Sequence, residues 1–108
     1  YNNIQIDGCV EDIMGIAPLA DKYRAFRWHV IEIDGHDFKQ LLAAFDEARA
    51  TKGRPTMILA RTIMGRPISF MNDNYEWHGK PPTKEQGEVA LAELGTSLQE
   101  WSERLLTN

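Results

Sequence analysis

The sequence has one cysteine, no block of like charges and no long apolar run. Cys9 alone cannot form an internal disulfide, which predicts a reducing compartment such as the cytoplasm. No apolar run approaches the roughly 20 residues that a membrane-spanning helix needs. The formal net charge is −4 without a basic cluster, which argues against nucleic acid as a partner. A role on a membrane or on nucleic acid is therefore not expected.

The sequence also lacks an initial methionine, a signal peptide, internal repeats and low-complexity segments. Its 43% hydrophobic and 26% charged residues are typical of an ordinary globular domain. Residues 4–6 read as a strand that runs into an Asp-Gly turn, so the chain opens almost directly on a strand. We therefore predict that residues 1–108 form a single partial domain, incomplete at its N-terminal side.

Strand and helix patterns then alternate along the chain. Residues 28–33 are rich in β-branched and aromatic side chains, and residues 56–60 are continuously apolar, so both segments are predicted strands. Pro18 suits a first helical turn, and Leu19, Tyr23 and Phe26 share one helical face. The order strand, helix, strand, helix, strand predicts an α/β fold with a partial parallel sheet and helices on both faces.

The clearest predicted helix follows Asp37, whose carboxylate is a plausible N-cap. Gly53 and Pro55 end this helix. One apolar stripe runs along it over three turns, made of Phe38, Leu41, Leu42, Phe45 and Ala48.

Residues 62–82 form a long irregular stretch rich in glycine, proline and asparagine. Loops of this length in a compact domain are usually functional or disordered, and the apolar residues here favour function. Thr83 and Gln86 then form a capping-box pattern that opens a helix to about Leu94, ended by Gly95. A short helix over residues 97–105 follows, and the last two residues look like a chain end.

The three histidines have different contexts. His29 lies inside a strand pattern, where a structural role is favoured. His36 lies at a strand-to-helix turn, where turn chemistry and capping explain it well, although ligands bind at that edge of α/β sheets. His78 follows a strand and is flanked by Trp77 and Gly79 in the irregular stretch. We favour a functional role for His78, mostly because of the resemblance described next.

Four segments, in the right order, resemble transketolases over residues 1 to about 95; they are Tyr1–Gly8, Arg27–Asp37, Pro55–Gly65 and Trp77–Lys80. The resemblance implies the C-terminal portion of a thiamine-diphosphate-binding domain. It also implies the family's activity, which moves a two-carbon ketol unit between sugar phosphates, as in the pentose phosphate pathway. The cofactor would be thiamine diphosphate with Mg²⁺ or Ca²⁺.

The resemblance also implies roles for individual residues. Asn2 would bind the metal, and with it the cofactor, through its side-chain oxygen, and Ile4 would bind the metal through its carbonyl; such hard oxygen donors suit Mg²⁺ and Ca²⁺. His78 would contact the cofactor diphosphate and the substrate and act in catalysis. Met64 departs from family members with lysine there, so a lysine contact from this position is not expected.

The resemblance implies partners as well, because parts of a transketolase are missing from these 108 residues. They are the upstream Gly-Asp-Gly segment with its metal-binding aspartate, the substrate-binding histidines, and a second, pyrimidine-binding domain or subunit with the glutamate that activates the cofactor. The intact enzyme is expected to be a homo-oligomer, formed from one chain or split chains, and this piece alone is expected to be inactive.

Two alternatives stay open. One is a related thiamine-diphosphate enzyme, 1-deoxy-xylulose-phosphate synthase or a dihydroxyacetone synthase; the segment Trp77–Lys80 favours transketolase over the former. The other is a non-catalytic interaction module that kept the fold and lost the chemistry.

Overall fold

The computed structural model describes residues 1–106, so the predicted chain end at Thr107 and Asn108 lies outside the described residues. The chain divides into two compact units, Tyr1–Thr62 and Ile63–Asn108, and each is described by itself. That the whole chain is one partial domain stays a prediction.

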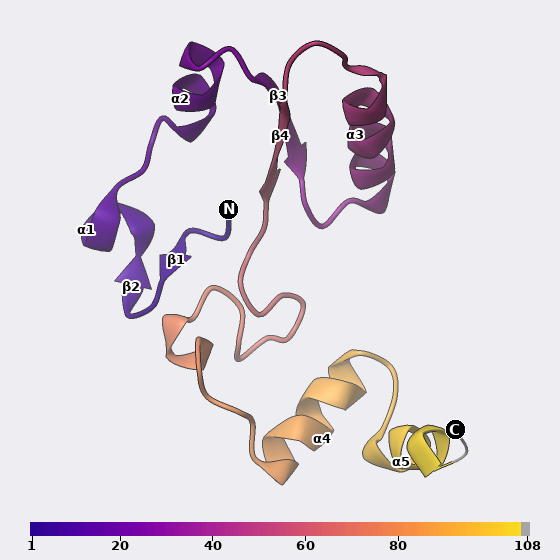
Figure 1. Cartoon of the computed structure of the whole chain (residues 1–108). Coiled ribbons are helices and arrows are strands. Elements are labelled where there is room, and N and C mark those ends of the chain that lie inside the picture. The colour runs from indigo at the N-terminus through magenta and orange to yellow at the C-terminus, as the bar shows by residue number, and fades with distance from the viewer. Residues whose placement is uncertain (107–108) are drawn as a thin grey trace. The chain divides into compact units, whose positions relative to one another are not determined.

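The first unit contains every strand of the described residues (Figure 1). In chain order its elements are β1 (Ile4–Gln5), β2 (Gly8–Cys9), α1 (Val10–Met14), α2 (Leu19–Ala25), β3 (His29–Asp34), α3 (Phe38–Ala50) and β4 (Thr56–Arg61). The second unit contains the 3-10 helix η1 (Tyr75–Trp77), α4 (Lys84–Glu93) and α5 (Leu98–Leu106). The predicted strands over residues 28–33 and 56–60, the two predicted helices between Pro18 and Pro55, and the two C-terminal helices are thereby confirmed to within about two residues. The strand predicted over residues 4–6 is present only as β1, which pairs antiparallel with β2 and not with the parallel strands.

Strands β3 and β4 pair in parallel, with His29 opposite Thr56 and Asp34 opposite Arg61. Successive side chains of a strand point to opposite faces, so Glu32 and His29 lie on different faces of the pair. Glu32 bonds Arg24 of α2, and His29 bonds Glu47 of α3. Helices α2 and α3 therefore cover opposite faces of the strand pair (Figure 1), which confirms the α/β class with helices on both faces.

A further parallel contact lies on the other edge of β4. The amino group of Tyr1 donates to the carbonyl of Ala60 at 2.8 Å, and the N–H of Thr62 donates to the carbonyl of Tyr1 at 3.0 Å. This pattern is that of a parallel bridge between Tyr1 and Arg61. Tyr1 therefore lies beside the last residue of β4, and the next residue, Asn2, begins just beyond the carboxyl end of that strand.

Helix α3 begins as predicted, because the Asp37 carboxylate accepts the N–H groups of Lys39 at 2.8 Å and Gln40 at 3.3 Å. Its predicted apolar stripe divides, however. Leu41 and Ala48 are half-buried, while Phe38, Leu42 and Phe45 are exposed. The buried residue of α3 is Ala44, which lies outside the predicted stripe. A helix contacts a sheet along a single narrow face, and strands β3 and β4 cover no more than that face of α3.

Short-range capping residues also define where the helices of the second unit begin and end. Thr83 and Gln86 form the predicted reciprocal capping box at the start of α4. Gly95 follows α4 with φ +74°, in the left-handed region that glycine enters without a steric penalty. The irregular stretch stays irregular except for η1, whose cap is Asn74, and the Asn74 side chain accepts the N–H of Glu76 at 3.1 Å.

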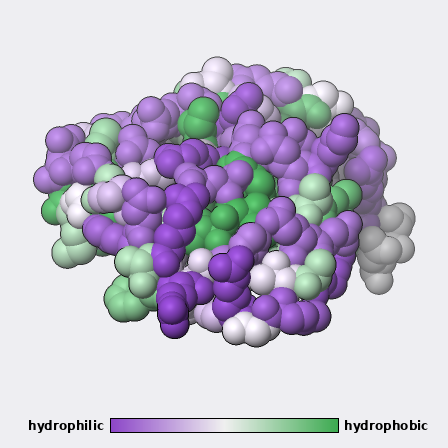
Figure 2. Space-filling model, turned by 90° about the horizontal axis from the view of Figure 1, so that it is seen from above, coloured by the Kyte–Doolittle hydropathy of each residue, from purple (hydrophilic) through white to green (hydrophobic). Residues whose placement is uncertain are grey.

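Buried apolar residues are few; in the first unit they are Ile4, Val10, Ile31, Ala44 and Leu59, and in the second Ile68. Within residues 1–106, no side chain is less than 2% exposed. Hydrophobic residues reach the surface among hydrophilic ones (Figure 2). Among the described helices, none combines the length and the apolar character that crossing a membrane requires.

Candidate functional site

The segment after Tyr1 makes a tight turn that fixes the Asn2 side chain. The side-chain oxygen of Asn2 accepts the backbone N–H of Ile4 at 3.1 Å. Asn3, between them, has φ +62°, a left-handed conformation that asparagine tolerates better than most residues. Ile4 is buried and Asn2 half-buried. The structure therefore brings the two predicted metal-binding residues into one small turn beyond the carboxyl end of β4.

The donors of this turn fit a hard divalent cation. An amide oxygen and a backbone carbonyl are ligands that Mg²⁺ and Ca²⁺ prefer, and an amide oxygen that accepts one N–H keeps a second lone pair. No cluster of three or more His, Cys, Asp or Glu residues suited to a metal occurs in residues 1–106. Asn2 and Ile4 could thus supply two ligands, and the remaining ligands would come from other groups.

The turn after β3 lies at the same end of the strand pair. The Asp34 side chain accepts the N–H of His36 at 2.9 Å, and the Gly35 N–H donates to the Arg61 carbonyl at 2.7 Å. A β-carbon on Gly35 would lie 2.6 Å from the Thr62 methyl, so this position requires glycine for close packing. These bonds agree with the predicted role of His36 in turn chemistry.

His29 lies at the opposite, amino end of β3. Its Nε2 lies 2.6 Å from a carboxylate oxygen of Glu47, and its Nδ1 lies 3.3 Å from the Arg54 guanidinium. The histidine thus joins β3, α3 and the segment before β4. These contacts support the structural role that its place in a strand predicts.

The irregular stretch is a tightly folded loop. Gly65 has φ +75°, and a β-carbon there would lie 2.6 Å from the Met71 carbonyl carbon. The N–H of Asp73 donates to the Met64 carbonyl at 2.8 Å, which closes the segment on itself. The sequence predicted a functional loop here, and this function stays a prediction; the closure of the loop on Gly65 was not visible in the sequence.

A carboxylate from α4 ties this loop down. Glu93 accepts the backbone N–H of Ser69 at 2.7 Å and the Ser69 hydroxyl at 2.5 Å. The hydrogen bond from the Ser69 hydroxyl has the largest effect on the pKa of the Glu93 carboxyl, followed by the bond from the Ser69 N–H. Both lower this pKa below its ordinary value. The pair joins residues 24 positions apart, so no short-range pattern could have revealed it.

His78 follows η1 directly and is exposed. The neighbouring Trp77 is half-buried; its indole N–H donates to the Phe70 carbonyl at 3.0 Å, and its ring contacts the Phe70 ring. Among the described residues, the His78 imidazole has no hydrogen-bond partner, so it is available to a ligand. That His78 and Asn2 contact the same cofactor stays a prediction, because the two residues belong to different units.

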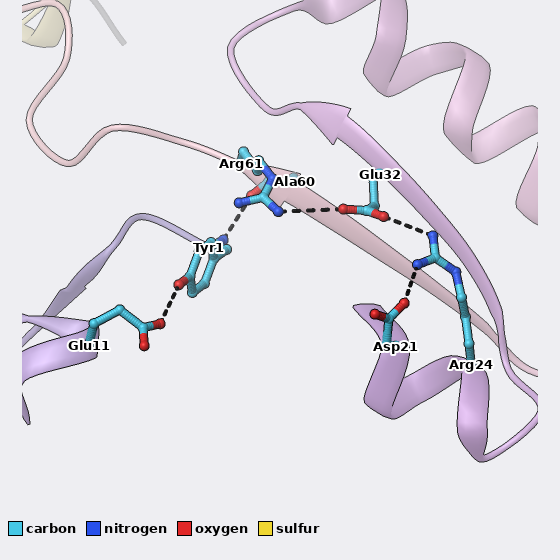
Figure 3. A network of polar contacts seen from close by, with 7 residues as sticks. All are labelled: Tyr1, Glu11, Asp21, Arg24, Glu32, Ala60 and Arg61. Atoms are coloured by element: carbon cyan, nitrogen blue, oxygen red, sulfur yellow. Dashed lines mark hydrogen bonds and ion pairs between the residues drawn. The ribbon is translucent and has the colours of Figure 1, made fainter. Parts of the chain in front are cut away.

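A line of charged side chains, which sequence reasoning missed, lies next to Tyr1 (Figure 3). Arg61 lies 3.5 Å from Glu32, Glu32 lies 2.8 Å from Arg24, and Arg24 lies 2.9 Å from Asp21. The hydrogen bond from Arg24 lowers the pKa of the Glu32 carboxyl, and the same bond raises the pKa of Arg24. An open hollow of about 460 Å³ lies beside this line; it is lined by Glu32, Ile33, Asp34, Gln40 and Arg61.

An α/β unit with oxygen donors just beyond its strand ends has the arrangement of α/β domains that bind ligands at this edge. The comparisons then define the family. The family described as "Transketolase, thiamine diphosphate binding domain" matches residues 1–101. The chain belongs to this transketolase family.

Individual relatives agree. The chain is 43% identical over 94 residues to a 6-deoxy-6-sulfo-D-fructose transketolase subunit of Clostridium sp. (strain MSTE9), covering 87% of this chain and 34% of that subunit. It is 30% identical to an apulose-4-phosphate transketolase subunit of Phocaeicola vulgatus, covering 91% of this chain and 35% of that subunit. It is 40% identical to human transketolase, covering 77% of this chain and 13% of that enzyme.

A solved structure agrees with the fold. The crystal structure of transketolase from Campylobacter jejuni superposes with a TM-score of 0.81 at 25% identity, covering 89% of this chain and 15% of that one. The chain thus spans about a third of the two bacterial subunits and a smaller part of the longer transketolases.

Proposed function

We propose that this chain is the C-terminal part of the cofactor-binding portion of a transketolase, which transfers a two-carbon ketol unit between sugar phosphates. The observation that carries the proposal is the Asn2 side-chain oxygen, held by the Ile4 N–H beyond the carboxyl end of β4. The family match supports thiamine diphosphate as the cofactor. The names of two relatives, each described as a subunit, support an enzyme assembled from more than one chain.

Each site residue has a proposed task. Asn2 and Ile4 would hold Mg²⁺ or Ca²⁺ through the side-chain oxygen and the backbone carbonyl, and the ion would supply positive charge for binding the cofactor diphosphate. The exposed His78 donates a ring N–H to the diphosphate and to substrate oxygens, where negative charge develops. When bound, thiamine diphosphate supplies the electron sink for the transfer.

The partners and location follow from the same proposal. The remaining metal ligands, the cofactor-activating glutamate and the acceptor-binding residues belong to other parts of a homo-oligomeric enzyme. Sugar phosphates are its substrates. The single exposed cysteine, Cys9, is free, which supports a reducing compartment, and we propose the cytoplasm.

The test is mutation in the intact enzyme. His78→Ala should lower kcat/KM by about 10²-fold, which corresponds to about 2.7 kcal/mol of transition-state stabilisation, with little change in Tm. Asn2→Ala should raise the metal concentration needed for cofactor binding, because a water must replace the lost ligand. Asn72→Ala, on the exposed loop surface, is the matched control for the amide and should leave both quantities unchanged.

Opposite results would contradict the assignment. If His78→Ala melts much lower but each folded molecule turns over normally, the histidine holds the loop and takes no part in catalysis. If no ketol transfer occurs in the intact enzyme while the fold persists, the alternative of a non-catalytic interaction module is favoured.

A further inference from the structure

We propose that Arg61 is a positioning residue, which holds Tyr1 and thereby sets the place of Asn2; the inference rests on the function proposed above. The bridge between Tyr1 and β4 is the starting point. It consists of the two backbone hydrogen bonds to Ala60 and Thr62, at 2.8 and 3.0 Å, on either side of Arg61. Tyr1 and Arg61 of β4 are therefore neighbours across this bridge.

The side chains repeat this pairing. The Arg61 guanidinium carbon lies 5.5 Å from the centre of the Tyr1 ring (Figure 3), a distance at which a cation is attracted to an aromatic face. The Tyr1 hydroxyl lies 3.5 Å from a carboxylate oxygen of Glu11. The ring is thus held on its face by Arg61 and at its edge by α1.

Arg61 is in turn oriented from two other elements. Glu32 of β3 bonds Arg61 with one carboxylate oxygen and Arg24 of α2 with the other, and Arg24 continues to Asp21. A carboxylate shared between two guanidinium groups restricts both. The orientation of the Arg61 guanidinium over the Tyr1 ring therefore depends on the charged side chains of β3 and α2.

The position of the Asn2 side-chain oxygen depends on Tyr1, because the backbone of Tyr1 sets where the turn that holds this oxygen begins. That oxygen accepts the Ile4 N–H, so the turn moves as a unit with the residue that precedes it. A shift of Tyr1 along β4 would displace the oxygen from the point where a metal ion requires it. Groups that orient metal ligands typically change metal affinity by about 10- to 100-fold when mutated.

A purely structural role predicts a different result. Exposed ion pairs contribute little to folding stability, and all four charged side chains in the line are exposed. If the line were only a surface network, its loss would change neither metal affinity nor, to any large extent, Tm. Metal affinity measured apart from activity therefore separates the two roles.

The experiment titrates Mn²⁺ into the intact enzyme with thiamine diphosphate present and follows free Mn²⁺ by electron paramagnetic resonance. Arg61→Met keeps the stem but removes the charge, and it should raise the Mn²⁺ dissociation constant by about tenfold. Arg61→Lys keeps the cation over the ring and should recover most of the affinity. Arg49→Met, which breaks the exposed pair with Asp46 on α3, is the matched control and should bind like the parent enzyme.

Asn2→Ala separates a failure of the positioning role of Arg61 from a failure of the metal site itself. Weakened binding in Asn2→Ala together with parent-like binding in Arg61→Met would overturn the positioning role and leave the metal site standing. Parent-like binding in Asn2→Ala would overturn the metal site and the proposed function of this turn. Equal losses in Arg61→Met and Arg61→Lys, with a lowered Tm in both, would show that Arg61 acts through folding and would also overturn the positioning role.

Discussion

Replacing Gly65 with alanine should open the loop that carries His78. Gly65 has φ +75°, and a side chain in the left-handed region costs about 1–2 kcal/mol per residue. The new β-carbon would lie 2.6 Å from the Met71 carbonyl carbon and 2.7 Å from the Met71 β-carbon, with the carbonyl oxygen closer still. Relaxed carbon contacts lie at about 3.5–4.0 Å, so the chain at Met71 must move by about 1 Å.

The magnitude is the sum of these two effects. Overpacking of a well-packed site costs about 1–3 kcal/mol, which brings the expected loss for Gly65→Ala to about 2–5 kcal/mol. Gly95→Ala is the matched control in the same unit, because Gly95 has φ +74° and a β-carbon added there would meet nothing within 4 Å. The control should therefore lose only the conformational part, about 1–2 kcal/mol.

Amide hydrogen exchange in the intact enzyme is the suitable assay, because it reports local opening. The Asp73 N–H, which donates to the Met64 carbonyl at 2.8 Å, should exchange faster by about tenfold for each 1.4 kcal/mol lost at Gly65. Gly95→Ala should leave this amide unchanged. Equal exchange at Asp73 in both variants would refute the reasoning, because neither the steric nor the conformational cost at Gly65 would then have opened the loop.

Three further predictions concern capping, pH and association. Asp37→Ala should lower the free energy of unfolding by about 0.5–2 kcal/mol in urea denaturation, because α3 loses its N-cap. The lowered pKa of Glu93 means that its hydrogen bonds to Ser69 are present above about pH 4.3, the ordinary glutamate value, and are lost as the pH falls through the lowered pKa. Loop proteolysis should accelerate there, and Ser69→Ala should weaken this pH dependence, because the hydroxyl is lost and the backbone N–H remains. The 108-residue chain alone should associate in light scattering, because large apolar side chains such as Phe38 are exposed; a cooperatively melting monomer that turns over xylulose 5-phosphate would contradict this.

Short-range chemistry explains what could be predicted from the sequence. The N-cap of α3, the capping box of α4 and the glycine after α4 each depend on residues within four positions of one another. The parallel pairing of β3 and β4 followed from the alternation of strands and helices, since consecutive parallel strands need a crossover. The same reasoning placed His78 on an irregular loop.

Long-range contacts explain what could not be predicted. The apolar stripe of α3 gave no indication that Phe38, Leu42 and Phe45 would stay exposed, because burial depends on what packs against the helix. The bridge from Tyr1 to β4 joins residues about 60 positions apart, and a single N-terminal residue has no strand pattern of its own. The contact of Arg61 with Glu32 spans 29 positions and follows from strand register, which the sequence did not specify.

The candidate site lies where these two kinds of contact meet. At Asn2, Asp34 and Asn74, a side-chain oxygen accepts the backbone N–H two residues on, at 2.9 to 3.1 Å. Such turns need only an asparagine or aspartate, so they shape the backbone beside Ile4, His36 and η1 without help from the core. They do not, however, fix where each turn lies, and for Asn2 that is done by β4 and Arg61. The position of the Asn2 oxygen thus depends both on a local turn, which the sequence shows, and on a distant support, which only the structure shows.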